Sequence, residues 1–133
     1  MSFPYNENTA TVDITRLCGA FCDFFFVFNE NENQDVEFTM MDDDSALNLT
    51  GLYMQFRVAR STPGLETEVV LDVLNADITV TTNVVTFSVD NSDIPEPGAY
   101  SATLIVGSNS DFDKIRVLAK GSVAVTESLF EDE

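Results

Sequence analysis

Carboxylates dominate the side chains of this sequence that could do chemistry. The chain has 23 aspartate and glutamate residues against 6 lysines and arginines, and it contains no histidine. The lack of histidine removes the commonest general base, the Ser-His and Cys-His nucleophile systems and nearly all zinc catalysis. A glycosidase could work with two carboxylates alone. However, the acids fall in expected turns and tails, and the chain has no tryptophan and only 3 tyrosines to line a sugar cleft. We therefore predict that the protein is not an enzyme.

The run Asp42-Asp43-Asp44 is the clearest candidate for a metal site. A calcium loop counted from Asp42 needs an oxygen ligand at its fifth position and glycine at its sixth. The sequence places Ala46 and Leu47 there. We expect a solvated turn instead. The sequence also lacks the glycine-rich loops that bind phosphate groups, so we predict no cofactor and no resident metal.

The only two cysteines, Cys18 and Cys22, are four residues apart. In an extended strand this spacing places their Cα atoms about 13 Å apart, beyond the roughly 7 Å limit for a disulfide. We expect buried free thiols, because a disulfide would need a turn, which Gly19 permits but does not require. Two thiolates without histidine or a second cysteine pair would also leave zinc underligated.

The formal net charge of −17 limits the partners of the chain. Binding to nucleic acid relies on clustered lysine and arginine, so we exclude nucleic acid as a direct ligand. Two interpretations of the acidity stay open: solubility through mutual repulsion, and docking to a basic surface of a neighbouring subunit.

The sequence gives no sign of a targeting or membrane segment. Residues 1–16 lack the basic start and apolar core of a signal peptide, and no apolar run reaches the roughly 20 residues that span a bilayer. We expect neither a signal peptide nor a transmembrane segment, no membrane partner, and a cytoplasm-like compartment unless a particle carries the protein out.

Period-two alternation of apolar residues organises the chain. The central example is residues 48–64, where a polar turn precedes a strand whose inward residues are Leu52, Met54, Phe56 and Val58. The turn after it contains Pro63-Gly64, which favours a hairpin with residues 66–74. At 133 residues and 44% hydrophobic content, the chain fits one domain. We predict an all-β, immunoglobulin-like antiparallel β-sandwich of about 7–8 strands.

Further strands follow from the same alternation. We expect core positions in five runs: Val36, Phe38 and Met40; Val69, Leu71 and Val73; Val85, Phe87 and Val89; Tyr100, Ala102, Leu104 and Val106; and Ile115, Val117, Ala119, Gly121, Val123 and Val125. Leu118 is then expected to point outward, and a bulge is expected near Gly121, where a missing Cβ permits a kink. We expect the Tyr100 hydroxyl to bond to backbone at the end of the sandwich.

The two ends of the chain differ from its centre. Residues 1–16 are predicted to form an arm ordered only by contact with something else, residues 17–126 the sandwich, and residues 127–133 an acidic tail. The first strand, residues 18–28, is apolar on both faces. Either the arm or a loop covers its second face, or that face is an intersubunit contact. The candidate interface residues are Phe21, Phe25, Val27, Leu129 and Phe130.

Four short motifs together resemble a known family. They are Asn48-Leu49-Thr50-Gly51, Met54-Gln55-Phe56-Arg57, Pro97-Gly98-Ala99-Tyr100 and Gly121-Ser122-Val123-Ala124-Val125. In this order, over residues 12–127, the chain resembles small phage virion domains whose best-known members are the N-terminal domains of phage baseplate upper proteins.

The resemblance implies a non-catalytic structural or adaptor protein of a tailed phage particle. It would act at the tail tip, the baseplate or the fibre attachment, as a homo-oligomer among other virion structural proteins. It would assemble in the host cytoplasm through its N-terminal arm and phenylalanine-rich first strand. A capsid decoration protein is the alternative. A receptor- or carbohydrate-binding module is a further one, but it would predict aromatic loop tips where this sequence has asparagine, aspartate, serine and proline.

Overall fold

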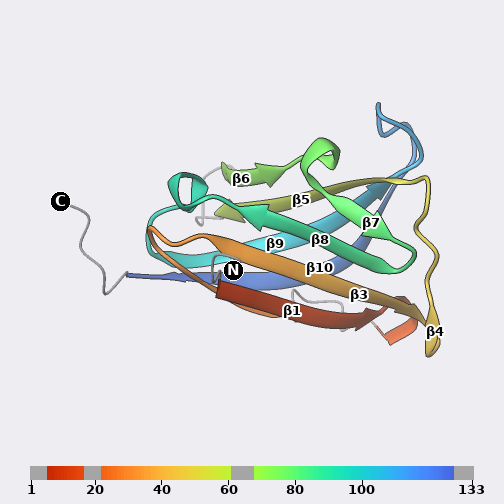
Figure 1. Cartoon of the computed structure of the whole chain (residues 1–133), viewed down its shortest axis with the longest axis horizontal. Helices are drawn as coiled ribbons and strands as arrows, with labels where there is room; N and C mark the ends of the chain where they lie inside the picture. The colour runs from red at the N-terminus through yellow and green to blue at the C-terminus, as the bar shows by residue number, and fades with distance from the viewer. Residues whose placement is uncertain (1–5, 17–21, 61–67, 128–133) are drawn as a thin grey trace, which may run out of the picture.

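The computed structural model describes residues 6–16, 22–60 and 68–127. These residues form two five-stranded sheets that pack face to face (Figure 1). The first sheet has the order β1 (Asn6–Asp13), β3 (Gln34–Asp42), β8 (Val84–Val89) and β7 (Thr79–Thr81), with β4 (Ser45–Ala46) also paired to β3. The second has the order β2 (Phe25–Asn29), β10 (Ile115–Thr126), β9 (Gly98–Gly107), β5 (Tyr53–Arg60) and β6 (Glu68–Val73).

Short 3₁₀ turns supply the remaining regular structure: η1 (Ile14–Arg16), η2 (Asn75–Asp77) and η3 (Asn91–Asp93). The predicted all-β sandwich is confirmed, although the described residues contain ten strands where we expected seven or eight. Within these residues, no helix has the length and apolar character needed to cross a membrane.

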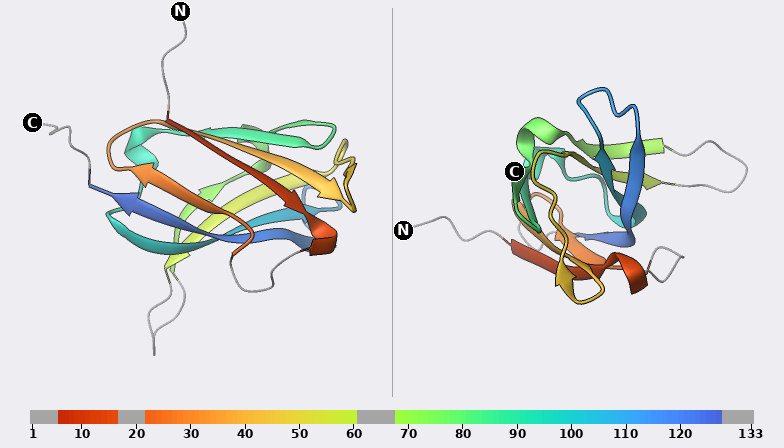
Figure 2. Two further views of the ribbon diagram at one scale, coloured as in Figure 1. Left: turned by 90° about the horizontal axis from the view of Figure 1, so that it is seen from below. Right: turned by 90° about the vertical axis from the view of Figure 1, so that its right-hand side faces the viewer.

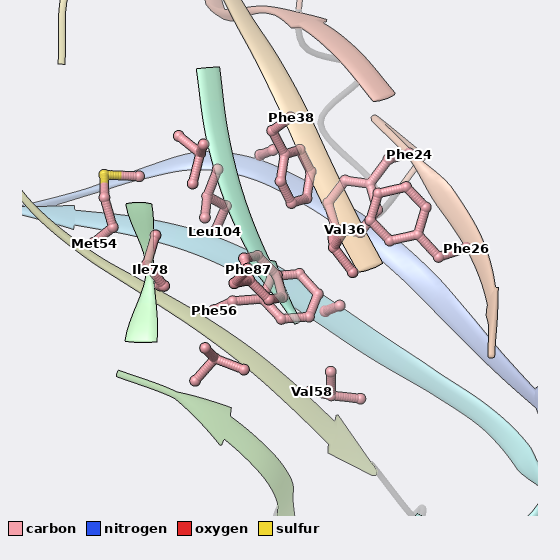
Figure 3. Packing of buried hydrophobic residues seen from close by; sticks show 14 of the residues in the cluster. Phe24, Phe26, Val36, Phe38, Met54, Phe56, Val58, Ile78, Phe87 and Leu104 are labelled. Atoms are coloured by element: carbon pink, nitrogen blue, oxygen red, sulfur yellow. The ribbon is translucent and has the colours of Figure 1, made fainter. Parts of the chain in front are cut away.

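Aromatic rings fill the space between the sheets. Phe24 lies 5.0 Å from Phe38 across the core, and Phe56 of the second sheet lies 4.9 Å from Phe87 of the first, both measured between ring centroids (Figure 3). Each buried phenylalanine contributes about 1.5–3 kcal/mol relative to an exposed one. The predicted inward residues of β3, β8 and β9 are buried, as are Met54, Phe56 and Val58 of β5.

Two pairings differ from the expected antiparallel arrangement. β1 pairs with β3 in parallel, and β2 pairs with β10 in parallel. A parallel pair needs a crossover connection between its strands. Here β2, in the second sheet, lies between β1 and β3 along the chain, and most of the chain separates β2 from β10 (Figure 2). Both sheets are therefore mixed.

The prediction that residues 1–16 are an arm ordered only by contact with something else does not hold for residues 6–16, which the structure describes. All eight residues of β1 pair with β3, and Val12 is buried in the core. Asn8 donates from Nδ2 to Oε1 of the buried Gln34 at 3.2 Å. From Asn6 onward, the segment that we set apart as an arm belongs to the sandwich.

The expectation of free thiols is also wrong, because Cys22 is disulfide-bonded. The only other cysteine of the chain, Cys18, lies outside the described residues. Our argument against a disulfide assumed an extended strand from Cys18 onward. β2 begins only at Phe25, so that distance does not apply at Cys22.

Bulges explain the core residues that we assigned wrongly. In β10 the register shifts between Val117 and Ala119, so Leu118 turns inward and Ile115 is 64% exposed. A second shift opposite β6 lies between Val58 and Ala59. Val69 is consequently exposed rather than inside, and Leu52, which precedes β5, is exposed as well. An extra residue reverses which alternate set faces the core.

The bulge expected near Gly121 is present in β10 at Leu118, and Gly121 itself has a packing role. A Cβ placed on Gly121 would lie 2.5 Å from atoms of the Phe24 ring. The ring therefore rests on the bare backbone of β10, which only glycine allows.

At the end of the sandwich, the Tyr100 hydroxyl donates to the backbone carbonyl of Glu96, as predicted. Arg60 Nη2 donates to the Tyr100 oxygen at 3.1 Å, and the guanidinium lies 5.4 Å from the ring centroid. Hydrogen bonds from Arg60 to Tyr100 and then to Glu96 raise the pKa of the guanidinium.

Asp13 fastens the end of β1 to the turn between β3 and β4. Its carboxylate accepts from the backbone N–H groups of Asp43 at 3.1 Å and Asp44 at 2.9 Å. Arg16 holds the same turn through two bonds to Asp44, at 2.8 and 2.9 Å. The hydrogen bond from the Thr15 hydroxyl and that from the Asp44 backbone are the main reasons why the pKa of Asp13 is far below its usual range. The run of acids from Asp42 is thus a turn, as predicted.

We predict that Gly121→Ala destabilises the protein by about 1–3 kcal/mol, because the new methyl group overlaps the Phe24 ring. Urea unfolding of the variant measures this change. Phe24→Leu in the Gly121→Ala background should recover part of the loss by making room for the methyl group. An unchanged midpoint for Gly121→Ala alone would contradict the close contact.

We predict that Asp13→Ala lowers the melting temperature at pH 7 and has less effect in acid. The folded-state pKa of Asp13 is depressed, so its stabilisation is present above the unfolded-state pKa of about 3.9 and is lost as the pH falls below it. Melting curves of both proteins between pH 7 and pH 2 measure the difference. A constant difference over this range would show that the carboxylate charge is not involved.

Candidate functional site

The outer edge of the second sheet carries exposed apolar side chains. Along β2, Phe26 and Phe28 point into the core, while Phe25 is 65% and Val27 41% exposed. These exposed residues are two of the predicted interface residues, and the structure brings them together on one face. The described residues leave both of them accessible. The other three candidates, Phe21, Leu129 and Phe130, lie outside the described residues.

Small residues surround Phe25 on the outer face of the second sheet. Ser122 lies opposite Phe25 and Ala124 opposite Val27 in the β2–β10 ladder, and on β9 the next residues across are Ser101 and Ala99. Together they form a shallow depression of about 330 Å³ that no charged residue lines. Its lining residues are Phe25, Ala99, Tyr100, Ser101, Ser122, Val123 and Ala124. We call this area the β2 surface.

Among the described residues, β2 has a ladder partner only on the β10 side. Ser122 donates its N–H to the Phe24 carbonyl at 3.0 Å, and in a parallel ladder every second residue bonds to the same neighbour. Phe25 and Val27 therefore direct their backbone groups away from β10. The Val27 N–H reaches Asn8 Oδ1 at 3.3 Å. Asn8 of β1 thus occupies part of this edge, while Phe25 has no ladder partner on that side among the residues that the structure describes.

Sequence reasoning found the large residues of the β2 surface and missed the small ones. Ala99 and Ser101, like Ser122 and Ala124, occupy the outward positions of their strands. A pair of small residues at alternate positions on two strands is a usable signal for a flat surface. It becomes visible only when the two strands are known to be neighbours.

A second concave surface lies on the outer face of the first sheet. It is a groove of about 940 Å³ whose floor includes Glu7, Asp35, Glu37 and Ser88, which follow one another across β1, β3 and β8. Residues of β6 line the same groove. We expected the acids to lie in turns and tails. Glu7, Asp35 and Glu37 lie on strands instead. Within the described part of the chain, no group of three or more metal-ligating side chains is arranged to hold an ion.

Neither models of known protein families nor curated proteins match this sequence. Among solved structures, the fold is similar to the N-terminal domain of phage TP901-1 ORF48. The match has a TM-score of 0.59 at 10% sequence identity and covers 90% of this chain and 98% of that domain. The resemblance drawn from the turn and strand motifs is confirmed at the level of the fold. At this level of identity the similarity is one of fold: the two packed sheets of this chain resemble that phage domain in overall structure.

Proposed function

We propose that the protein is a non-catalytic structural component of a tailed phage particle, at the tail tip, baseplate or fibre attachment. Neighbouring virion proteins, including copies of itself, would hold it through the β2 surface. The observation that carries this proposal is the exposed pair Phe25 and Val27 beside a depression without charged residues. The fold shared with a phage domain supports the virion as its location.

The β2 surface has the properties of a contact between proteins. An exposed aromatic residue is a common anchor at such contacts, and burying Phe25 would contribute about 1.5–3 kcal/mol. The small side chains of Ala99, Ser101 and Ser122 let a partner approach the sheet closely. The backbone groups of Phe25, which point away from β10 and have no ladder partner in the described part of the chain, are hydrogen-bonding groups that a partner strand can use.

The acidity of the chain favours this particular surface for assembly. With a net charge of −17, two copies repel each other over most of their surfaces. This repulsion is weakest at a surface lined by uncharged residues, such as the β2 surface. The same charge then discourages association elsewhere, which favours one defined arrangement over disordered aggregation.

The structure leads us to revise which N-terminal segment would make the assembly contact. Residues 6–13 are committed to β1 and cannot act as a free arm while the sheet is intact. We therefore assign the contact to β2 alone. The described loop residues do not favour a carbohydrate-binding module either. Phe112, at the tip after β9, packs its ring against Gly107, where a Cβ would lie 2.2 Å from the ring.

We predict that Phe25→Ser lowers incorporation of the protein into phage particles by about tenfold or more, because the anchor side chain is lost. Particles assembled with each variant are purified and the bound protein is quantified by immunoblot. Ile115→Ser is the matched control, because Ile115 is 64% exposed and Phe25 65%, and Ile115 lies outside the β2 surface. Immunogold labelling of the particles separates a tail position from a capsid position.

Incorporation of Phe25→Ser at the level of the wild type would show that the β2 surface is not the contact. If the gold label were confined to the capsid, the protein would be a capsid decoration protein and not a tail component. Sedimentation of the purified wild type and of Phe25→Ser adds a test of self-association, with a shift toward monomer expected for the variant.

A further inference from the structure

We propose that the groove on the first sheet binds an extended, basic segment of a partner protein, which adds a strand to the open edges of β6 and β8. This site shares no lining residue with the β2 surface. It involves β8 of the first sheet and β6, the edge of the second sheet that lies opposite β2, and it does not depend on the β2 surface. Two features carry the proposal: two strand edges, without ladder partners among the described residues, that line one groove, and the charge of the lining of that groove.

The free edge of β6 is the first of the two edges. The Met54 N–H donates to the Asn75 side chain at 2.8 Å, on the β6 side of β5. Alternation then turns the backbone groups of Phe56 and Val58 toward β6 as well. Their partners Val73 and Leu71 use their own groups in that ladder. Asp72, between them, therefore directs its N–H and C=O away from β5, where the described residues provide no ladder partner.

The free edge of β8 is the second of the two edges. The Met40 N–H bonds to the Asn83 carbonyl at 2.8 Å, so alternate residues of β3 from Met40 backward face β8. Their partners include Phe87 and Val89, and Ser88 between these faces the side of β7. β7 pairs with β8 only from Thr79 onward, opposite Thr86. The backbone of Ser88 therefore has no ladder partner on that side among the described residues.

Both edges line the same groove. Val70 to Val73 form one side of it, and Thr86 to Val89 belong to the other. In Figure 1, β6 and β8 run along the same part of the molecule, one from each sheet. A strand rises about 3.3 Å per residue, so the four β6 residues that line the groove offer a pairing edge of about 13 Å. A partner segment of about five residues would occupy it.

Charge selects the kind of segment. The lining contains seven carboxylates and no lysine or arginine. Among the described residues, Asp72 is the only one of the seven with a cation within ion-pair distance, Arg57 Nη2 at 3.6 Å. Glu7, Asp35 and Glu37 lie in neighbouring register positions on the floor. In an extended chain alternate side chains point the same way, so lysine or arginine at every second position would face these acids.

The test uses a synthetic peptide, acetylated and amidated, in which lysine and valine alternate over seven residues. Isothermal titration calorimetry measures its binding to the full chain, and hydrogen exchange follows the backbone amides. We expect saturable binding that weakens with salt, and slower exchange at Asp72 and Ser88. A peptide with glutamate in place of lysine should not bind. A peptide N-methylated at its valines should bind more weakly, because it cannot donate those hydrogen bonds.

The variant Glu7→Gln/Glu37→Gln/Asp93→Asn should weaken binding about tenfold, since three partly solvated charge pairs are lost. The matched control Asp42→Asn/Asp111→Asn/Glu127→Gln removes the same charge outside the groove and should leave affinity unchanged. Equal losses in both variants, unchanged exchange at Asp72 and Ser88, or no binding at millimolar peptide would each overturn the proposal. Phe25→Ser should bind the peptide as the wild type does, so this result is independent of the β2 surface.

Discussion

The fold depends on aromatic rings packed between two sheets. Phe24 and Phe26 from one end of the chain, Phe38 and Phe87 from the first sheet, and Phe56 from the second lie with neighbouring ring centroids about 5 to 6 Å apart. Such a core requires each strand to keep one dry face, which is why period-two alternation runs through the whole sequence. It also requires Gly121, since the Phe24 ring occupies the space that a side chain there would fill.

The alternation was enough to predict the strands that cross the centre of the sandwich. It identified the inward faces of β3, β8 and β9 correctly because none of these strands contains an extra residue that would interrupt the alternation. It failed at Leu118 and Val69, where one extra residue changes the face that points inward. Nothing in the local sequence marks those positions, because a bulge depends on the fit to the neighbouring strand.

Strand pairing could not be predicted from the sequence either, because it too depends on the fit between strands that are distant in the chain. β1 is short of apolar residues and reads as a polar arm, yet hydrogen bonds to β3 and the burial of Val12 make it part of the sheet. Only part of the candidate site could be predicted from the sequence. Phe25 and Val27 stand out in the sequence, whereas the small residues of the β2 surface and the acids of the groove become neighbours only through the ladders. The two sheets consequently present different outer faces, one centred on uncharged residues and one acidic.

The pairing of β2 with β10 has a consequence for how the protein is made. Phe26 and Phe28 lie near the start of the chain, and their ladder partners, Val123 and Val125, lie near its end. A ribosome must synthesise the roughly one hundred residues between Phe26 and Val123 before the second sheet can close. Until then, the strongly hydrophobic β2 segment has no partner strand. Partly folded chains at this stage are prone to aggregate. The many carboxylates emerging with it give the nascent chain a charge that keeps neighbouring nascent chains apart.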